Sequence, residues 1–194
     1  NSYSWASPDI AMAVADFKDL WIADRKSGLL RMKNMNELSA MVLAGPFSND
    51  AISITSRNGK TIICGGGIDA AWNNLYKPFN ISVYQNKSWE AITSASNHDA
   101  MRAVIDPLNN NHFFISTWGS GLLEFENNRI IKNYTDLNSQ LQNIIPGSPY
   151  VRICGMAIDN KGYLWLSQPE VSSTIKALKP DGTWIVNPVS VSAA

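Results

Sequence analysis

The stretch HFFISTWGSGLLEFENN, residues 112–128, places a Trp-Gly-Ser-Gly turn between two short apolar runs. Both runs are rich in aromatic and branched residues and end at turn residues, which is typical of β-strands. The same Ser-Gly-Leu corner stands between two similar runs at 20–32. A backbone position that needs positive φ explains this recurrence better than a glycine-rich ligand loop does. We therefore predict that the turn is a corner between two strands.

The corner belongs to a repeat that occurs four times along the chain. Each copy has a short apolar strand, a polar turn and a second apolar strand, and further strands follow. The second strands carry the anchor residues Trp21, Ile63, Phe114 and Trp165, which stand 42, 51 and 51 residues apart. A four-stranded propeller blade needs roughly 40 to 50 residues. The spacing therefore predicts an all-β chain of about four four-stranded antiparallel β-propeller blades, with Trp165 in a blade core.

We expect the whole chain, 1–194, to form one propeller fragment. Its blades are expected at approximately 11–48, 50–96, 99–135 and 151–190. An insertion, IDAAWNNLYKPF at 68–79, lengthens the second repeat between its second and third strands. Only 35–44 and 136–144 have a plausible helical period, and we expect at most one helical turn in each.

Composition narrows the classes of partner. Lys plus Arg and Asp plus Glu are both 16 of 194 residues, so the net charge is zero and nothing favours nucleic acid. Charged residues make up only 16%, which suits an extracytoplasmic β-protein. No apolar run approaches the roughly 20 residues of a membrane helix. No basic segment followed by an apolar core opens the chain, so we expect no signal peptide in it.

The two cysteines, Cys64 and Cys154, lie in apolar segments of non-adjacent repeats. We expect both to occupy buried strand positions as small hydrophobic residues. Because the repeats are not neighbours, we expect no disulfide between the two thiols.

AIDNKGYLWLS at 157–167 and AVADFKDLWIADRKSGLLRM at 13–32 resemble the two-component regulator propeller motif of Bacteroidetes. The Trp-Gly-Ser-Gly-Leu corner at 118–122 is similar to a corner of the same motif. The resemblance implies seven-bladed propellers, as in sensor domains of hybrid two-component systems and in PorZ-type components of the type IX secretion system. Seven blades need roughly 300 residues. We therefore expect a part of a larger propeller, whose open edges pair with the rest of the parent chain or with another copy.

Catalytic and metal-binding motifs are weak. His98 and His112 are fourteen residues apart and lack the spacing of zinc ligands. Ser96, His98 and Asp99 are too close in sequence to converge as a triad. CGGGID at 64–69 lacks the order of a phosphate-binding loop. We expect no catalytic residue, no metal and no cofactor, and therefore no enzyme.

The binding candidates are aromatic residues in loops. Trp72, Tyr76 and Phe79 lie in the insertion, Trp118 lies in the corner, and Arg152 stands beside the start of a strand. Exposed aromatic rings stack on sugars or anchor a partner, and an arginine pairs with an anionic group. Packing between blades is the alternative role for each of these side chains.

Function is inferred from the resemblance. It implies a non-catalytic binding and assembly module of the periplasm or cell surface, of the PorZ type, which recognises anionic polysaccharide or lipopolysaccharide, or protein partners of a secretion or signalling complex. The alternative is a periplasmic sensor propeller that binds oligosaccharide. A propeller hydrolase is the third reading, and it requires two carboxylates that face one pocket.

Overall fold

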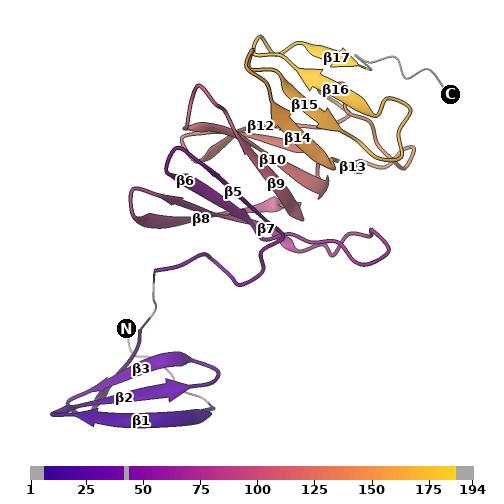
Figure 1. The fold of residues 1–194 in the computed structure, drawn as a ribbon. Helices are drawn as coiled ribbons and strands as arrows, with labels where there is room; N and C mark the ends of the chain where they lie inside the picture. Colours follow the sequence, from indigo (N-terminus) through magenta and orange to yellow (C-terminus); the bar gives the residue numbers. More distant parts are fainter. Residues whose placement is uncertain (1–6, 42–43, 187–194) are drawn as a thin grey trace. The chain divides into compact units, whose positions relative to one another are not determined.

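The computed structural model describes residues 7–41 and 44–186, and Figure 1 shows their strands. Every regular element in these residues is a β-strand. The strands form four antiparallel sheets, and within each sheet the first four strands pair in chain order. The all-β propeller-blade prediction is confirmed. Asn1–Gly45 and Pro46–Ala194 form two compact units, which are described separately.

The first unit contains one sheet. Its strands are β1 (Ile10–Asp16), β2 (Asp19–Asp24), β3 (Gly28–Lys33) and β4 (Glu37–Ala40). Within 35–41, where at most one helical turn is expected, the structure has a strand instead, because β4 pairs with β3 and half-buries Leu38. Asn34 and Met35 supply the positive φ values, 49° and 57°, of the hairpin between them. Sheet pairing has therefore overridden a weak helical period.

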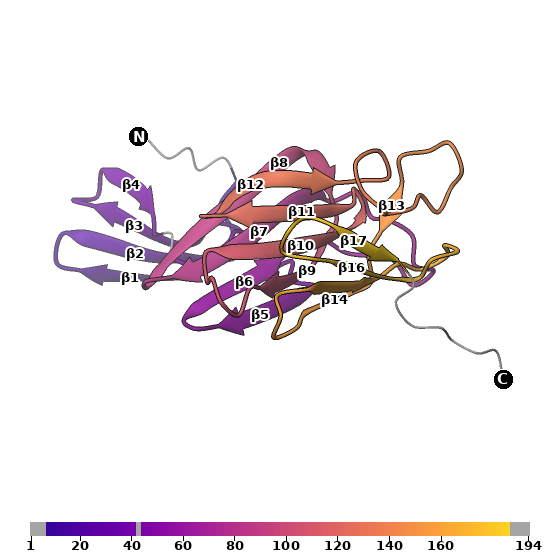
Figure 2. The same ribbon diagram turned by 90° about the horizontal axis from the view of Figure 1, so that it is seen from above.

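The second unit contains the other three sheets, which Figure 2 shows from a second direction. The second sheet comprises β5 (Ser53–Arg57), β6 (Lys60–Cys64), β7 (Pro78–Gln85) and β8 (Ser88–His98). The third comprises β9 (Ala100–Ile105), β10 (His112–Gly119), β11 (Leu122–Glu126), β12 (Arg129–Tyr134) and the short β13 (Val151–Arg152). The fourth comprises β14 (Gly155–Ile158), β15 (Leu164–Ser167), β16 (Ile175–Leu178) and β17 (Trp184–Val186).

The Ser-Gly-Leu corners connect second strands to third strands, as the sequence predicts. Gly28 and Gly121 have φ values of 75° and 88°. A Cβ on Gly121 would lie 2.2 Å from the Tyr134 carbonyl oxygen. The Trp-Gly-Ser-Gly segment is thus a corner of the backbone that requires glycine at position 121.

Two apolar clusters hold the three sheets of the second unit together. Successive residues of a strand point to opposite faces. Phe113 and Ile115 accordingly pack in a cluster with Ile62 of the second sheet. Phe114 packs in the other cluster, with Leu164 of the fourth sheet. The third sheet is therefore buried on both faces.

Two of the anchor assignments need correction. In the pairing of β10 with β9 and of β15 with β14, the first paired residues are Phe113 and Leu164, so Trp165 is the counterpart of Phe114. Phe114 is buried, but Trp165 lies opposite the Leu164 face, belongs to neither cluster and is half-buried. In the second sheet Ile62 enters the core, whereas the anchor Ile63 is half-buried on the other face.

The cysteines agree only partly with expectation. Cys64 is fully buried in β6, and burial raises the pKa of its thiol to about 12. Cys154 lies between β13 and β14 and is half-buried, so its expected place in a buried strand is wrong. Both thiols are free.

Within the described ranges, no helix has the length and apolar character to cross a lipid bilayer.

Candidate binding site

A buried carboxylate fixes the long loop between β6 and β7. Asp99 is fully buried between β8 and β9, and its Oδ1 accepts the backbone N–H of Lys77 at 3.0 Å. Its Oδ2 accepts the N–H of Tyr76 at 2.9 Å and the Asn74 amide at 3.1 Å. Three N–H donors satisfy the carboxylate without a cation. Asp99 therefore clamps the end of the insertion to the sheet.

Trp118 positions Trp72 at the surface. The Trp118 indole is 2% exposed, and its Nε1 donates a 2.8 Å hydrogen bond to the Trp72 carbonyl oxygen. The two ring centroids are 6.0 Å apart, and the Trp72 side chain is 61% exposed. Trp72 also has a φ of 64°, a conformation that non-glycine residues rarely adopt. A strained, anchored loop thus presents one indole to solvent.

Arg152 lies behind the tryptophans. Its guanidinium is 5.0 Å from the Trp118 ring centroid and 4.9 Å from that of Tyr150. Arg152 pairs with Trp118 across β13 and β10 and is only 8% exposed. Its Nη2 donates to the Tyr150 hydroxyl at 2.9 Å, and its Nη1 contacts the exposed Glu170 carboxylate at 3.3 Å. An anionic ligand would have to displace Glu170 to reach Arg152.

Tyr76 stands apart from this stack. Its ring is 5.2 Å from that of His98 and is 68% exposed. The His98 Nδ1 lies 3.0 Å from the Ser120 hydroxyl. Of the five expected site residues, the structure brings Trp72, Trp118 and Arg152 together and places Tyr76 against His98. The fifth, Phe79, is fully buried in the apolar cluster against Phe125, so its expected place among exposed aromatic residues is wrong. Trp118 and Arg152 support the surface from below, and their role in binding stays a prediction.

Sequence reasoning missed Asp99, Asn74 and Tyr150. The cluster at 96–99 drew attention only as a poor catalytic triad, while Asp99 serves as a backbone clamp. A short polar residue directly after a strand end was the available signal. Nothing local in the sequence indicates that Tyr150 would lie beside Arg152.

A hollow of about 420 Å³ opens beside Tyr76. Its lining comprises Tyr76, Pro78 and residues 94–98, and we call it the Tyr76 hollow. The pairing of β7 with β8 jumps from Phe79–Ser94 to Pro78–His98, so residues 95–97 form a bulge. Bulges redirect side chains and occur frequently beside functional sites. The bulge builds one wall of the hollow.

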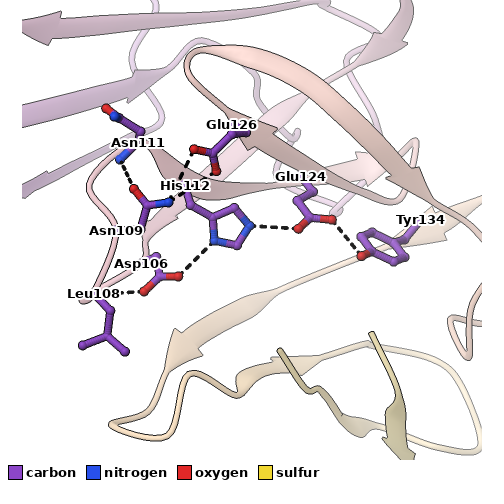
Figure 3. A network of polar contacts seen from close by, with 8 residues as sticks. All are labelled: Asp106, Leu108, Asn109, Asn111, His112, Glu124, Glu126 and Tyr134. Atoms are coloured by element: carbon purple, nitrogen blue, oxygen red, sulfur yellow. Dashed lines mark hydrogen bonds and ion pairs between the residues drawn. The ribbon is translucent and has the colours of Figure 1, made fainter. Parts of the chain in front are cut away.

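Figure 3 shows a second polar cluster at the end of the third sheet. The His112 ring contacts Asp106 Oδ2 at 3.0 Å through Nδ1 and Glu124 Oε1 at 2.8 Å through Nε2. The Tyr134 hydroxyl donates to Glu124 Oε2 at 2.8 Å. Hydrogen bonding to Glu124 and Asp106 raises the pKa of His112 to about 9, while His112 lowers the pKa of Glu124.

These groups satisfy one another. Both imidazole nitrogens face carboxylates, and the Asp106 Oδ1 that remains accepts the Leu108 N–H at 2.8 Å. A protonated His112 between two carboxylates ties β10 to β11 and to the turn after β9. The arrangement is typical of a structural ion-pair network, since no group is left to transfer a proton to a ligand.

No group of three His, Cys, Asp or Glu side chains within 7–41 and 44–186 is arranged to hold a metal ion.

Comparison with known proteins supports the fold. No family model matches the sequence, and no curated protein sequence matches it either. Among solved structures, the chain is similar to PorZ, described as an essential bacterial surface component of the type IX secretion system of Porphyromonas gingivalis. The TM-score is 0.67 at 23% identity, over 92% of this chain and 26% of PorZ.

The chain is also similar to the extracellular domain of a putative one-component system of B. thetaiotaomicron, with a TM-score of 0.50 at 10% identity. That match covers 99% of this chain and 23% of the other. The chain thus spans about a quarter of the length of both proteins. These similarities show a β-propeller fold, and the neighbours include the secretion-component group that the sequence resemblance implies.

Proposed function

We propose that this chain is part of an extracytoplasmic β-propeller that acts as a non-catalytic binding and assembly module, of the PorZ type, and recognises anionic polysaccharide. The Trp72–Trp118–Arg152 stack carries the proposal. It presents an exposed indole, fixed by a buried one, with a guanidinium beneath. Aromatic rings stack on sugar rings, and arginine pairs with carboxylate or phosphate groups.

The cellular location rests on the same neighbours. One is described as a bacterial surface component and another as an extracellular domain. The low charged fraction, 16%, agrees with a location outside the cytoplasm. A secreted or surface-exposed module would meet polysaccharides and surface proteins there.

The charge arrangement suits a regulated anion contact. Arg152 is nearly buried, but its partner Glu170 is exposed and the pair is 3.3 Å long. An ion pair with one solvated member contributes little stability, so a ligand anion can replace it at small cost. The proposal therefore expects anion binding to displace the Glu170 carboxylate from Arg152.

A hydrolase needs two carboxylates poised at one pocket. Asp106, Glu124 and Asp181 line one hollow between the third and fourth sheets. His112 holds the first two, and Asp181 Oδ1 accepts hydrogen bonds from the backbone N–H and the hydroxyl of Thr183. This arrangement supports a binding role over glycoside hydrolysis for the chain.

The second candidate function is an oligosaccharide sensor. The Tyr76 hollow favours it, because an exposed aromatic ring stands beside uncharged polar side chains there.

Calorimetry separates the two functions. Purified anionic lipopolysaccharide and a panel of neutral oligosaccharides are titrated into the chain. Heat from the lipopolysaccharide, reduced by Trp72→Ala, supports the surface assembly module. Heat from oligosaccharide alone supports the sensor, and no heat from either contradicts polysaccharide recognition by this chain.

A further inference from the structure

The Tyr76 hollow is lined by a mostly buried asparagine, Asn97. Asn97 is only 7% exposed, and the part of it that remains accessible lines the hollow. Buried amides are nearly always hydrogen-bonded, to protein or to bound molecules. A ligand in the hollow can therefore reach an amide that offers both a donor and an acceptor.

The bulge in β8 explains why Asn97 is in this position. Three residues, 95–97, lie between the two pairs that join β8 to β7. In a regular ladder, these residues would continue to pair with β7. The bulge instead places Asn97 in the wall of the hollow together with His98, whose buried Nε2 lacks a hydrogen-bond partner.

Tyr76 forms the opposite element of the site. The Asp99 carboxylate accepts the backbone N–H of Tyr76, whose φ is 52°. The Tyr76 ring lies against the ring of His98. Because the ring is exposed but its backbone is clamped, little conformational freedom is lost when a ligand stacks on it. A prearranged aromatic face beside amide, imidazole and hydroxyl groups suits a polyhydroxylated ring.

The lining of the Tyr76 hollow also argues against an anionic sugar as the preferred ligand. It consists of tyrosine, proline, alanine, serine, asparagine and histidine, with no lysine, arginine or carboxylate. Lys77, the next residue after Tyr76, lines the adjacent hollow and pairs with Asp50 at 3.2 Å. An anionic sugar would find no counter-charge in the Tyr76 hollow.

We infer that the Tyr76 hollow binds an uncharged saccharide ring, which stacks on Tyr76 and hydrogen-bonds to the Asn97 amide. The inference rests on the proposed polysaccharide recognition and adds a neutral subsite separate from the Arg152 stack. The adjacent hollow, of about 460 Å³, shares Pro78, Ser94 and Ala95 with the first. A second sugar unit therefore has room to continue along the same wall.

The test is an NMR titration of the ¹⁵N-labelled full chain, in which the side-chain amide resonance of Asn97 is monitored. The probes are the methyl glycosides of glucose, galactose and mannose, with methyl glucuronate as the anionic comparison, each up to about 50 mM. At least one neutral glycoside shifts the Asn97 resonance saturably, and its disaccharide binds more tightly. Saturable shifts from the glucuronide alone, or from no probe, overturn the inference.

Variants assign the effect to the site. Tyr76→Ala weakens binding of the neutral glycoside by roughly tenfold or more, because the stacking face is removed. Phe17→Ala, which removes an exposed aromatic ring outside the candidate sites, leaves it unchanged. Equal binding by the Tyr76 variant overturns the inference. If the chain binds no lipopolysaccharide but binds the neutral glycoside through Tyr76, the proposed anionic recognition is contradicted and the inference about the Tyr76 hollow stands.

Discussion

Aromatic residues at equivalent positions of successive blades contribute differently to the free energy of unfolding. Phe114 and Trp165 occupy equivalent places in β10 and β15, but only Phe114 is covered by a following sheet. Truncating a buried aromatic residue removes its transfer free energy and leaves a cavity. Truncating a half-exposed one removes less of both.

We predict that Phe114→Ala lowers the free energy of unfolding by about 3 to 5 kcal/mol. Trp165→Ala should lower it by only about 1 kcal/mol, because the Trp165 ring is only partly buried and belongs to neither apolar cluster. Urea unfolding followed by tyrosine and tryptophan fluorescence measures both losses. Equal losses would place Trp165 in a core that the structure does not show.

The corner between β10 and β11 yields a second prediction. Gly121→Ala brings a methyl group within 2.2 Å of the Tyr134 carbonyl oxygen and strains a φ of 88°. We expect a loss of about 3 kcal/mol or more. Gly182→Ala is the matched control, with a φ of 83° and open space around the new methyl, and should cost about 1 kcal/mol. Thermal unfolding of the two variants would refute the steric argument if they lost the same stability.

At the scale of elements, the His112 cluster links β10 and β11 through charge. The pKa of His112 is raised from 6.5 to about 9, so its stabilisation is complete below about pH 6.5 and is lost as pH rises through about 9. The pKa of Glu124 is lowered from 4.5, so its contribution is present above about pH 4.5 and is lost as pH falls further.

His112→Gln should therefore cost most between about pH 5 and 7, on the order of 2 kcal/mol, and little near pH 10. Urea unfolding of the wild type and the variant across this range gives the difference directly. A difference that does not change with pH would mean that His112 contributes through shape and not through charge.

The strands and corners that recur in each blade could be predicted from the sequence, because each strand is a short apolar run that ends at a turn residue. The corners at Gly28 and Gly121 are of this kind. The face of each strand was harder to predict. Aligning Ile63 with Phe114 placed the wrong residue toward the core, since a shift of one position turns every side chain to the other face.

The candidate site was only partly predictable for a different reason. Trp72 and Tyr76 could be selected as aromatic loop residues, but their arrangement depends on Asp99, which binds their loop from another strand end. The place of Asn97 in the hollow follows from a bulge, which no local pattern indicates. Contacts between segments far apart in sequence decide which aromatic residues are exposed and which are buried.

At the scale of the whole molecule, each sheet of the second unit obtains its core from a neighbouring sheet. The third sheet is covered on both faces, while the Trp165 face of the fourth is lined by small and apolar residues and forms an open hollow of about 450 Å³. The same organisation leaves the loops at 65–77 and the bulge at 95–97 free to form a surface. We therefore expect the connections between strands to contribute to binding, whereas the repeated sheets contribute most of the stability.

The most direct test of the binding-module account is calorimetric titration of anionic lipopolysaccharide into the full chain and into two variants. The account predicts saturable heat for the wild type, an affinity roughly tenfold lower for Trp72→Ala, and no change for the exposed control Phe17→Ala. Unchanged affinity in Trp72→Ala, or no heat from the wild type, would contradict it.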